Sequence, residues 1–336
     1  MIGDGFKLDA TYNELVKKCV KKVVAEELRK FQKKVLKNCV TRWNSILFMV
    51  RSINNISEVE YAKLVSLLNE KKYNRADFKL SKLERIYLAE LQKILESFEF
   101  VTDEFQSDGV TSSKVFPLVT WLTKKLNENF EQSKHTQSFK RVLLDKIEER
   151  FGEYIKSDLF KLSAVLDPRF GISVFKLEDR VNVTERLKSN LSNLDKIVGD
   201  EINAEPKTTL ISQNETKKFQ KEALRDATYK SLKYLAKEST SSASVSLIDD
   251  MIQNYYSEIL ASTFECEDPL EFWKRNELKY PKLAALAKKF LGVPASSASA
   301  ERMFSIAGHI FSVKRRRMGI KLFERLVFLK LNEEFM

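Results

Sequence analysis

The sequence has 336 residues, of which 43% are hydrophobic and 31% are charged, enough to bury the core of one large or two ordinary domains. Its three cysteines are far apart and it has only two histidines, which argues against a disulfide scaffold and against a zinc finger. No stretch reaches the ~18 consecutive apolar residues that a spanning helix needs, so we expect no membrane partner.

The positive charge of the chain is concentrated near its two ends. The formal net charge is +11. Residues 17–37 contain nine lysines and arginines against two glutamates, and residues 314–325 contain six against one. The remainder is therefore close to neutral. Basic segments of this kind fit a polyanion, so DNA is a candidate partner, but they also occur as solvated surfaces.

Apolar residues recur at three- and four-residue spacing along most of the chain, and there are only nine glycines and six prolines. The first such segment, residues 12–35, predicts a long amphipathic helix with lysines on the opposite face. That basic face has two interpretations, a solvated helix surface or a stripe that contacts phosphates.

Further helices are predicted after residue 45. Their ranges are Ile46–Ile53, Val59–Leu68, Leu80–Phe100, Val115–Phe130 and Phe139–Phe160. Pro168 interrupts this series, because proline lacks a backbone N–H and disfavours helical geometry at Asp167 before it. Beyond it, residues 199–247 read as a polar, partly disordered linker with one helix.

The pattern therefore predicts a mainly α protein with little or no sheet. We expect a helical domain over residues 1–198, an array of helices with short polar connections, and a separate C-terminal domain over 248–336. The last helix of the C-terminal domain is apolar on more than one face. Such a helix needs two partners, one of which can be a second chain.

Several blocks of the C-terminal domain follow the order and spacing of the C-terminal dimerisation region of hAT-superfamily transposases. The blocks are Asp268–Leu270, Phe272–Trp273, Tyr280–Leu283, Val293–Pro294, Ala300–Ser305, Arg315–Met318 and Leu326–Asn332. Upstream, Thr41–Ser45 and Leu166–Arg169 resemble two further blocks of the same family in the right order. The resemblance to this family thus extends over most of the chain.

The resemblance implies a helical insertion followed by the C-terminal remnant of an RNase H-like fold, and self-association as a homodimer or higher oligomer. The candidate dimerisation residues are Trp273, Phe304, Leu322, Phe323, Leu326 and Leu329. The candidate DNA-binding residues are Arg42, Trp43, Arg302, Lys314, Arg315, Arg316 and Arg317. Trp43 matches a position where the family stacks an aromatic ring beside a flipped base, or it packs between helices under Arg42.

Glu301 matches the third of three carboxylates that bind two divalent metals in the family's active site. The first two, aspartates on strands, are not found in the 40 residues before Thr41, and neither is the BED-type zinc finger. One carboxylate cannot hold two metals. We therefore expect no enzymatic activity, no metal or other cofactor and no small-molecule substrate. From the residues alone, Glu301 should lie in the first turn of a helix that a serine of 296–299 caps.

The main hypothesis is a catalytically inactive, transposase-derived protein that dimerises through its C-terminus and acts as a nuclear DNA- or chromatin-associated factor. A fragment of an active DDE transposase and a helical protein-interaction scaffold are the alternatives. The run Lys314–Arg317 fits nuclear localisation, phosphate contact or a solvated loop. We also expect apolar surface on residues 282–310 to be exposed, which would reduce stability or require a partner.

Overall fold

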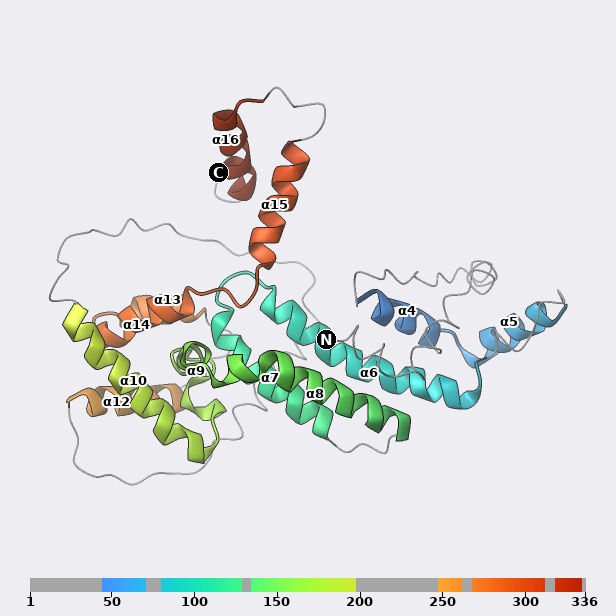
Figure 1. The fold of residues 1–336 in the computed structure, drawn as a ribbon, viewed down its shortest axis with the longest axis horizontal. Coiled ribbons are helices and arrows are strands. Elements are labelled where there is room, and N and C mark those ends of the chain that lie inside the picture. The colour runs from blue at the N-terminus through green and yellow to red at the C-terminus, as the bar shows by residue number, and fades with distance from the viewer. Residues whose placement is uncertain are drawn as a thin grey trace. The chain divides into compact units, whose positions relative to one another are not determined.

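The protein is described here by a computed structural model that covers residues 44–70, 80–128, 134–197, 247–261, 268–311 and 318–333. These residues form helices and turns without a strand, which confirms the prediction of a mainly α fold (Figure 1). The RNase H-like remnant stays a prediction. Within the same ranges, no helix is both long and apolar enough to cross a membrane. The basic helix predicted over residues 12–35 lies outside the described residues.

The chain divides into two compact units that are not consecutive in sequence. Unit 1 consists of residues 1–103 and 119–153, and unit 2 of residues 104–118 and 154–336. The helices that contribute to unit 1 are α4 (Asn44–Asn54), α5 (Glu58–Glu70), α6 (Lys82–Phe105), α7 (Ser112–Asn127) and α8 (Lys134–Lys156). The helices predicted to start near residues 46, 59, 80 and 115 are thereby confirmed.

Local capping decides where two helices of unit 1 begin. Before α5, the Ser57 hydroxyl accepts from the Glu60 amide at 3.2 Å, and the Glu60 carboxylate accepts from the Ser57 amide at 2.9 Å. Ser81 and Glu84 make the same reciprocal pair before α6, at 3.1 and 2.6 Å. Each pair satisfies two amides that would otherwise lack an intrahelical acceptor.

Helix α4 packs on α6 through an apolar face with one charged anchor. Leu47, Met49 and Val50 are fully buried. Beside them, the Arg51 guanidinium binds the carboxylates of Glu96 at 3.1 Å and Glu99 at 2.7 Å. This arrangement follows from the i, i+3, i+4 spacing, which puts the apolar residues on one side of the helix.

The helix predicted over Phe139–Phe160 is wrong in one respect, because two helices occupy this range. Helix α8 ends at Lys156, and α9 (Asp158–Val165) begins after Ser157. Ser157 has extended backbone angles of φ −61° and ψ 132°, so the i→i−4 ladder stops there. The apolar periodicity continues across the break, which is why the sequence alone does not reveal it.

Unit 2 contains the first residues of α7, up to Leu118, the last residues of α6 and α8, and all later elements. Its elements are α9, the 3₁₀ helix η2 (Gly171–Val174), α10 (Leu177–Ile197), α12 (Leu247–Ala261), α13 (Pro269–Asn276), α14 (Pro281–Leu291), α15 (Ala298–Ile310) and α16 (Ile320–Leu331). Helices α9 and α10 pack against α14, and α10 also packs against α12. The predicted domain division, with a linker over residues 199–247, stays a prediction.

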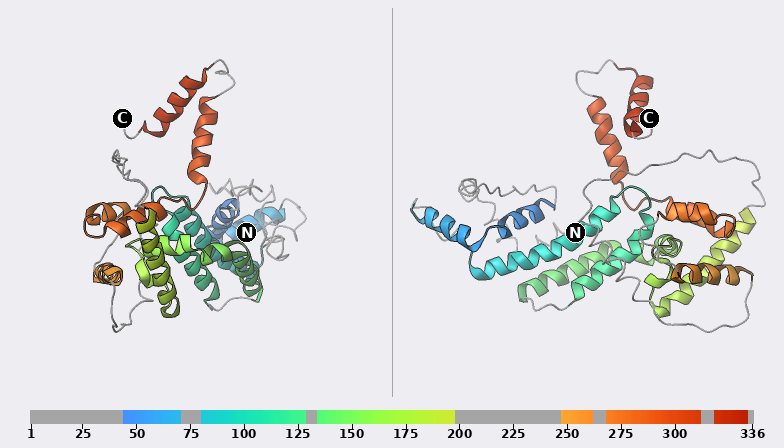
Figure 2. Two further views of the ribbon diagram at one scale, coloured as in Figure 1. Left: turned by 60° about the vertical axis from the view of Figure 1, so that its left-hand side comes forward. Right: turned by 180° about the vertical axis from the view of Figure 1, so that it is seen from behind.

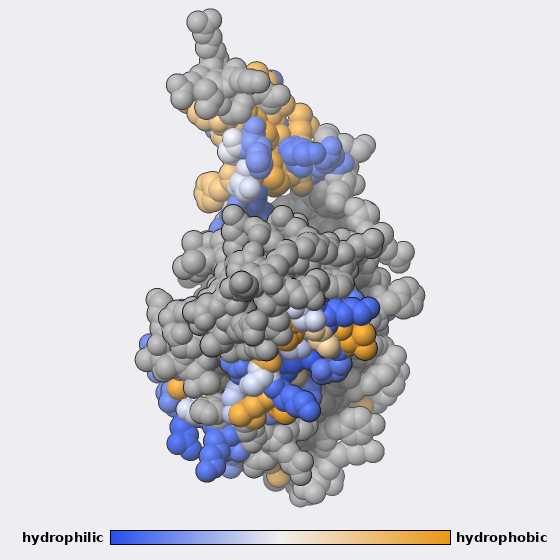
Figure 3. Space-filling view, turned by 90° about the vertical axis from the view of Figure 1, so that its right-hand side faces the viewer, coloured by the Kyte–Doolittle hydropathy of each residue, from blue (hydrophilic) through white to orange (hydrophobic). Residues whose placement is uncertain are grey.

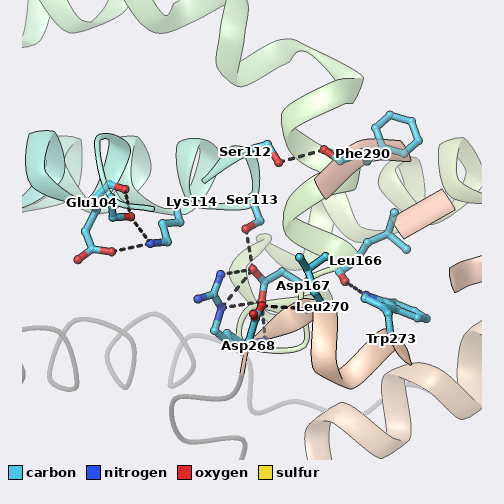
Figure 4. A network of polar contacts seen from close by, with 12 residues as sticks. Glu104, Ser112, Ser113, Lys114, Leu166, Asp167, Asp268, Leu270, Trp273 and Phe290 are labelled. Atoms are coloured by element: carbon cyan, nitrogen blue, oxygen red, sulfur yellow. Dashed lines mark hydrogen bonds and ion pairs between the residues drawn. The ribbon is translucent and has the colours of Figure 1, made fainter. Parts of the chain in front are cut away.

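The turn after α9 is the centre of unit 2. Asp167 is fully buried, and its carboxylate accepts from the Ser113 hydroxyl at 2.6 Å (Figure 4). Arg169 donates to the same carboxylate from its backbone N–H at 3.0 Å and from guanidinium Nη2 at 2.6 Å. Gly171, at φ +58°, completes the turn. The predicted interruption at Pro168 is confirmed, and Asp167 and Arg169 form a local ion pair across it.

Two aromatic side chains bind the backbone of this turn. The Trp273 indole N–H donates to the Leu166 carbonyl at 2.7 Å, and the Tyr255 hydroxyl donates to the Val165 carbonyl at 2.9 Å. Both rings are buried and lie 5.1 Å apart between centroids. Trp273 is therefore a residue of the core, and a direct part for it in dimerisation stays a prediction that this burial does not favour.

The expectation of exposed apolar surface over residues 282–310 is wrong for α14. Its apolar residues are buried, namely Leu283, Ala284, Leu286, Ala287, Phe290 and Leu291. They pack against α9, α10 and α13, whose partnership with α14 the sequence pattern does not reveal. The expectation holds for α15, which has no buried residue along its described length.

The buried tyrosines of unit 2 predict a loss of stability at high pH. Burial raises the pKa of Tyr256 to about 12 and that of Tyr255 well above its usual value. Between pH 10 and about 12 the unfolded chain releases these protons first, so the free energy of unfolding falls as pH rises, by up to about 1.4 kcal/mol per pH unit for each group. In urea titrations across this range, Tyr256→Phe should flatten the decline and Tyr154→Phe, an exposed tyrosine, should not. If the free energy of unfolding declines equally with pH in the parent and in both variants, burial of Tyr256 is not the cause.

Candidate functional site, an exposed apolar helical hairpin

Helices α15 and α16 form a hairpin at the C-terminal end of unit 2. They lie side by side in the three ribbon views (Figures 1 and 2). The facing residues of α15 are Met303, Ile306, Ala307 and Ile310, and those of α16 are Phe323, Leu326 and Val327; all are half-buried. Their i, i+3, i+4 spacing gives each helix one apolar stripe toward the other.

The hairpin exposes more apolar surface than this mutual contact covers. None of the described side chains of α15 and α16 is buried. Phe304 is 68% exposed, Ile320 76% and Phe328 65%, and the further exposed residues are Phe311, Leu322, Leu329 and Leu331. Figure 3 shows hydrophobic side chains gathered over the upper part of the molecule, where the hairpin lies. A gathering of exposed large apolar side chains of this kind indicates an interaction site.

The predicted dimerisation residues fall into three groups in this structure. Phe304, Leu322 and Leu329 lie on the exposed flanks of the hairpin. Phe323 and Leu326 lie in the half-buried stripe, where Phe323 meets Phe311 edge to face with ring centroids 5.7 Å apart. Trp273 lies in the core. The prediction omitted Phe311, Ile320, Phe328 and Leu331, although their apolar character and helical spacing could have indicated them.

Glu301 lies in the first turn of α15, as expected from the residues. It accepts a hydrogen bond from the Ser297 hydroxyl at 2.7 Å. The expected serine cap differs in detail, because Ser297 makes no side-chain cap bond to an amide. The Ser296 hydroxyl instead accepts from the Ala298 amide at 3.4 Å. Glu301 therefore helps to fix the start of the α15–α16 hairpin.

The described residues do not by themselves fit a two-metal centre. Within the ranges the structure covers, no three or more His, Cys, Asp or Glu side chains gather as a candidate ligand set. Two hard cations need several carboxylate oxygens between them, and Glu301 offers one exposed carboxylate already bonded to Ser297. The expectation that Glu301 binds no metal stays a prediction.

Of the predicted DNA-binding residues, the structure describes Arg302. Its guanidinium donates from Nη1 to the Gln106 carbonyl at 2.9 Å and from Nη2 to the Asp108 carboxylate at 2.8 Å. Arg42, Trp43 and Lys314–Arg317 lie outside the described residues. Arg302 is thus engaged with its own chain, at the base of the hairpin.

A buried ion pair lies beneath the loop that Arg302 contacts. The Lys114 ammonium lies 3.0 Å from a Glu104 carboxylate oxygen and 2.9 Å from the Ser107 hydroxyl (Figure 4). Both charged side chains are buried. Next to them along α7, the Ser112 hydroxyl donates to the Phe290 carbonyl at the end of α14 at 3.0 Å. These bonds hold the start of α7 in the core of unit 2.

Comparison with known protein families matches residues 252–333 to the hAT family C-terminal dimerisation region. This range begins in α12 and includes the whole hairpin. The C-terminal part of this chain is therefore an hAT dimerisation region. The matched range contains both the buried helices α13 and α14 and the exposed helices α15 and α16, so the hAT region combines a core with an apolar surface.

Similar proteins align with most of the chain. Zinc finger BED domain-containing protein 4 of Homo sapiens is 26% identical over 71% of this chain and 20% of its own length. The provisionally named transcriptional regulator tpeD of Talaromyces stipitatus is 25% identical over 88% and 31%. Zinc finger BED domain-containing protein 6 of Mus musculus is 26% identical over 76% and 28%. The chain spans less than a third of the length of each of these relatives, and its residues 252–333 carry the match to the hAT dimerisation region.

The buried Lys114–Glu104 pair gives a stability prediction for unit 2. Lys114→Met should lower the free energy of unfolding by about 3–5 kcal/mol, because it leaves the Glu104 carboxylate buried without its cation. Replacing both residues by Met should restore most of this loss, since neither charge of this pair then remains buried. Urea unfolding of the two variants and the parent tests this. Equal destabilisation by the single and the double variant would show that burial of an unpaired charge is not the cause.

Proposed function

We propose that this chain is a transposase-derived protein that self-associates through the α15–α16 hairpin, lacks catalytic activity and acts as a nuclear DNA- or chromatin-associated factor. The observation that carries the proposal is the exposure of the hairpin inside the hAT dimerisation region. Two amphipathic helices that expose Phe304, Ile320 and Phe328 need a further apolar partner.

A second copy of the chain is the partner that this surface fits best. Most homo-oligomers pair the same patch of two subunits about a two-fold axis, which needs a self-complementary surface. The hairpin offers aromatic and aliphatic residues that can interdigitate with themselves. Lys321, Glu324 and Arg325 lie at i−7, i−4 and i−3 of Phe328, so charged side chains stand among the apolar ones on that side of α16. Pairing of two hairpins would bury the flanks that one hairpin leaves open.

Charged substitutions on the hairpin test the self-association. Phe304→Glu and Phe328→Glu should each convert the dimer to a monomer in sedimentation equilibrium at micromolar concentration, because an unpaired carboxylate would have to enter the apolar interface. Leu278→Glu is the matched control, since Leu278 is 98% exposed in unit 2 but outside the hairpin.

The outcomes of this experiment separate the possible occupants of the surface. A dimer that only the hairpin variants dissociate supports the proposal. A parent protein that is monomeric at all concentrations would sink it and leave a different partner, or a further segment of a longer protein, as the occupant. A dimer that Leu278→Glu dissociates equally would place the interface elsewhere.

The non-enzymatic part of the proposal rests on the surroundings of Glu301 and on the relatives. The Glu301 carboxylate binds Ser297 at the start of α15 and is used there for helix structure. Two of the relatives are named after their BED zinc finger and one as a regulator of transcription. These names support a regulatory protein without a strand-transfer step, and we propose no metal cofactor for it.

The proposed DNA contact and nuclear location rest on charge and on the same names. Lys314–Arg317 connect α15 to α16 in the sequence, so the basic run belongs to the dimerisation hairpin. A dimer would carry two such runs. Their joint positive charge favours a polyanion, because each phosphate contact releases condensed counterions.

Salt-dependent DNA binding tests the nucleic-acid part. The variant with Gln at positions 314, 315, 316 and 317 should bind duplex DNA more weakly, and the slope of log K against log salt should shrink by up to about 3.6, that is about 0.9 for each lost contact. Fluorescence anisotropy between about 50 and 200 mM salt measures the slope. A second variant with Gln at 17, 18, 21 and 22 is compared in parallel. If the slope changes in the second variant alone, the contact lies near the N-terminal end and this assignment is wrong.

A further inference from the structure

The joint between α14 and α15 is held by polar contacts to one loop of unit 2. Residues 105–111, between α6 and α7, receive these contacts. The Ser296 hydroxyl donates to the Phe105 carbonyl at 2.9 Å, and the Ala295 amide donates to the Thr111 hydroxyl at 2.9 Å. Arg302, one turn into α15, adds its two guanidinium bonds to Gln106 and Asp108. All of these contacts involve the base of the hairpin.

The 105–111 loop is itself held in place by the buried Lys114 side chain. The buried Lys114 ammonium holds both Glu104 and Ser107, and the Ser107 hydroxyl donates to the Glu104 carbonyl at 2.8 Å. Gly109 has a positive φ of 81°, which most other residues adopt only with strain. The loop backbone is therefore held at Glu104 and Ser107, next to the Gln106 carbonyl that Arg302 binds.

The Gln106 carbonyl and the Asp108 carboxylate together suit a guanidinium group as their donor. The Arg302 Nη1 and Nη2 atoms reach separate oxygens at 2.9 and 2.8 Å, on the backbone of Gln106 and on the side chain of Asp108. A planar fork with several donors can bind two such acceptors together, whereas an ammonium group binds as a point charge without this directional match. By contrast, the main helix–helix contact of α15 is with α16, the other helix of the hairpin.

We propose that Arg302 is a positioning residue, which latches the base of the dimerisation hairpin to the 105–111 loop and so sets how the hairpin is presented to a second copy. This inference deepens the self-association proposed above and rests on it. It also replaces the DNA contact predicted for Arg302 by an intramolecular role.

The latch makes dimerisation sensitive to ionic strength. Arg302 and Asp108 side chains are 47% and 95% exposed, so salt screens their attraction. An apolar interface alone is not weakened by screening. We therefore expect the dimer dissociation constant to rise between about 1.5- and fivefold as KCl increases from about 50 to about 500 mM, within the range measured for exposed ion pairs.

Hydrogen exchange on the full chain tests the latch directly. Arg302→Gln should speed the exchange of backbone amides in residues 295–301 several-fold and leave the amides of α14 unchanged. Asp108→Asn should do the same, and the double variant should add little to either, because both changes open one contact. Arg302→Lys, which keeps the charge but not the fork, should lie between the parent and Arg302→Gln. The dimer of Arg302→Gln should lose most of its salt dependence.

Arg325→Gln is the matched control, because it removes one exposed arginine from the same hairpin. Equal exchange changes in Arg325→Gln and Arg302→Gln would overturn the latch and indicate a general charge effect. Unchanged exchange in Arg302→Gln would overturn it as well. If the protein is monomeric under all conditions, self-association fails, but the exchange experiment still decides whether Arg302 holds the hairpin base.

Discussion

Unit 2 depends on one buried carboxylate. Asp167 has no exposed surface, so its charge is tolerable only with close donors, and Ser113 and Arg169 supply them at 2.6–3.0 Å. Ser113 belongs to the start of α7, so the carboxylate also ties the turn to a segment over fifty residues earlier. With the turn fixed, the carbonyls at 165 and 166 point at Tyr255 and Trp273. The packing of α12 and α13 thus follows from the same turn.

The hAT dimerisation region divides its residues between a core and a surface. Helix α14 buries its apolar face against α9 and α10, and its last turn receives hydroxyl groups from Ser112 and Ser163 at the Phe290 carbonyl. After Gly292 the chain no longer enters that core. Helices α15 and α16 face one another, and each covers only one apolar stripe of the other. The remaining apolar side chains of both helices stay exposed. A rigid base carrying an apolar hairpin is a suitable arrangement for association, since little order has to be created on binding.

Sequence periodicity predicted the helices well and their partners poorly. The ranges from α4 to α7 follow from apolar spacing, and the pairs Ser57–Glu60 and Ser81–Glu84 could have fixed two starts more sharply. The break at Ser157 could not be read, because apolar spacing continues across it. The burial of α14 and of Trp273 could not be predicted from the sequence pattern either. Both depend on contacts with residues more than 100 positions away, such as Leu166, and a periodic pattern carries no information about the partner.

Association and folding stability are separable in this architecture. The expectation of reduced stability assumed that residues 282–310 as a whole expose apolar surface. Helix α14 is instead part of the core, which is closed by Trp273, Tyr255 and the Asp167 network without help from α15 or α16. Uncovering the hairpin therefore removes apolar burial only from the hairpin itself. The free energy of pairing two hairpins can accordingly be small or large without altering the fold that presents them, and the contacts at the hairpin base become the place where that presentation is set.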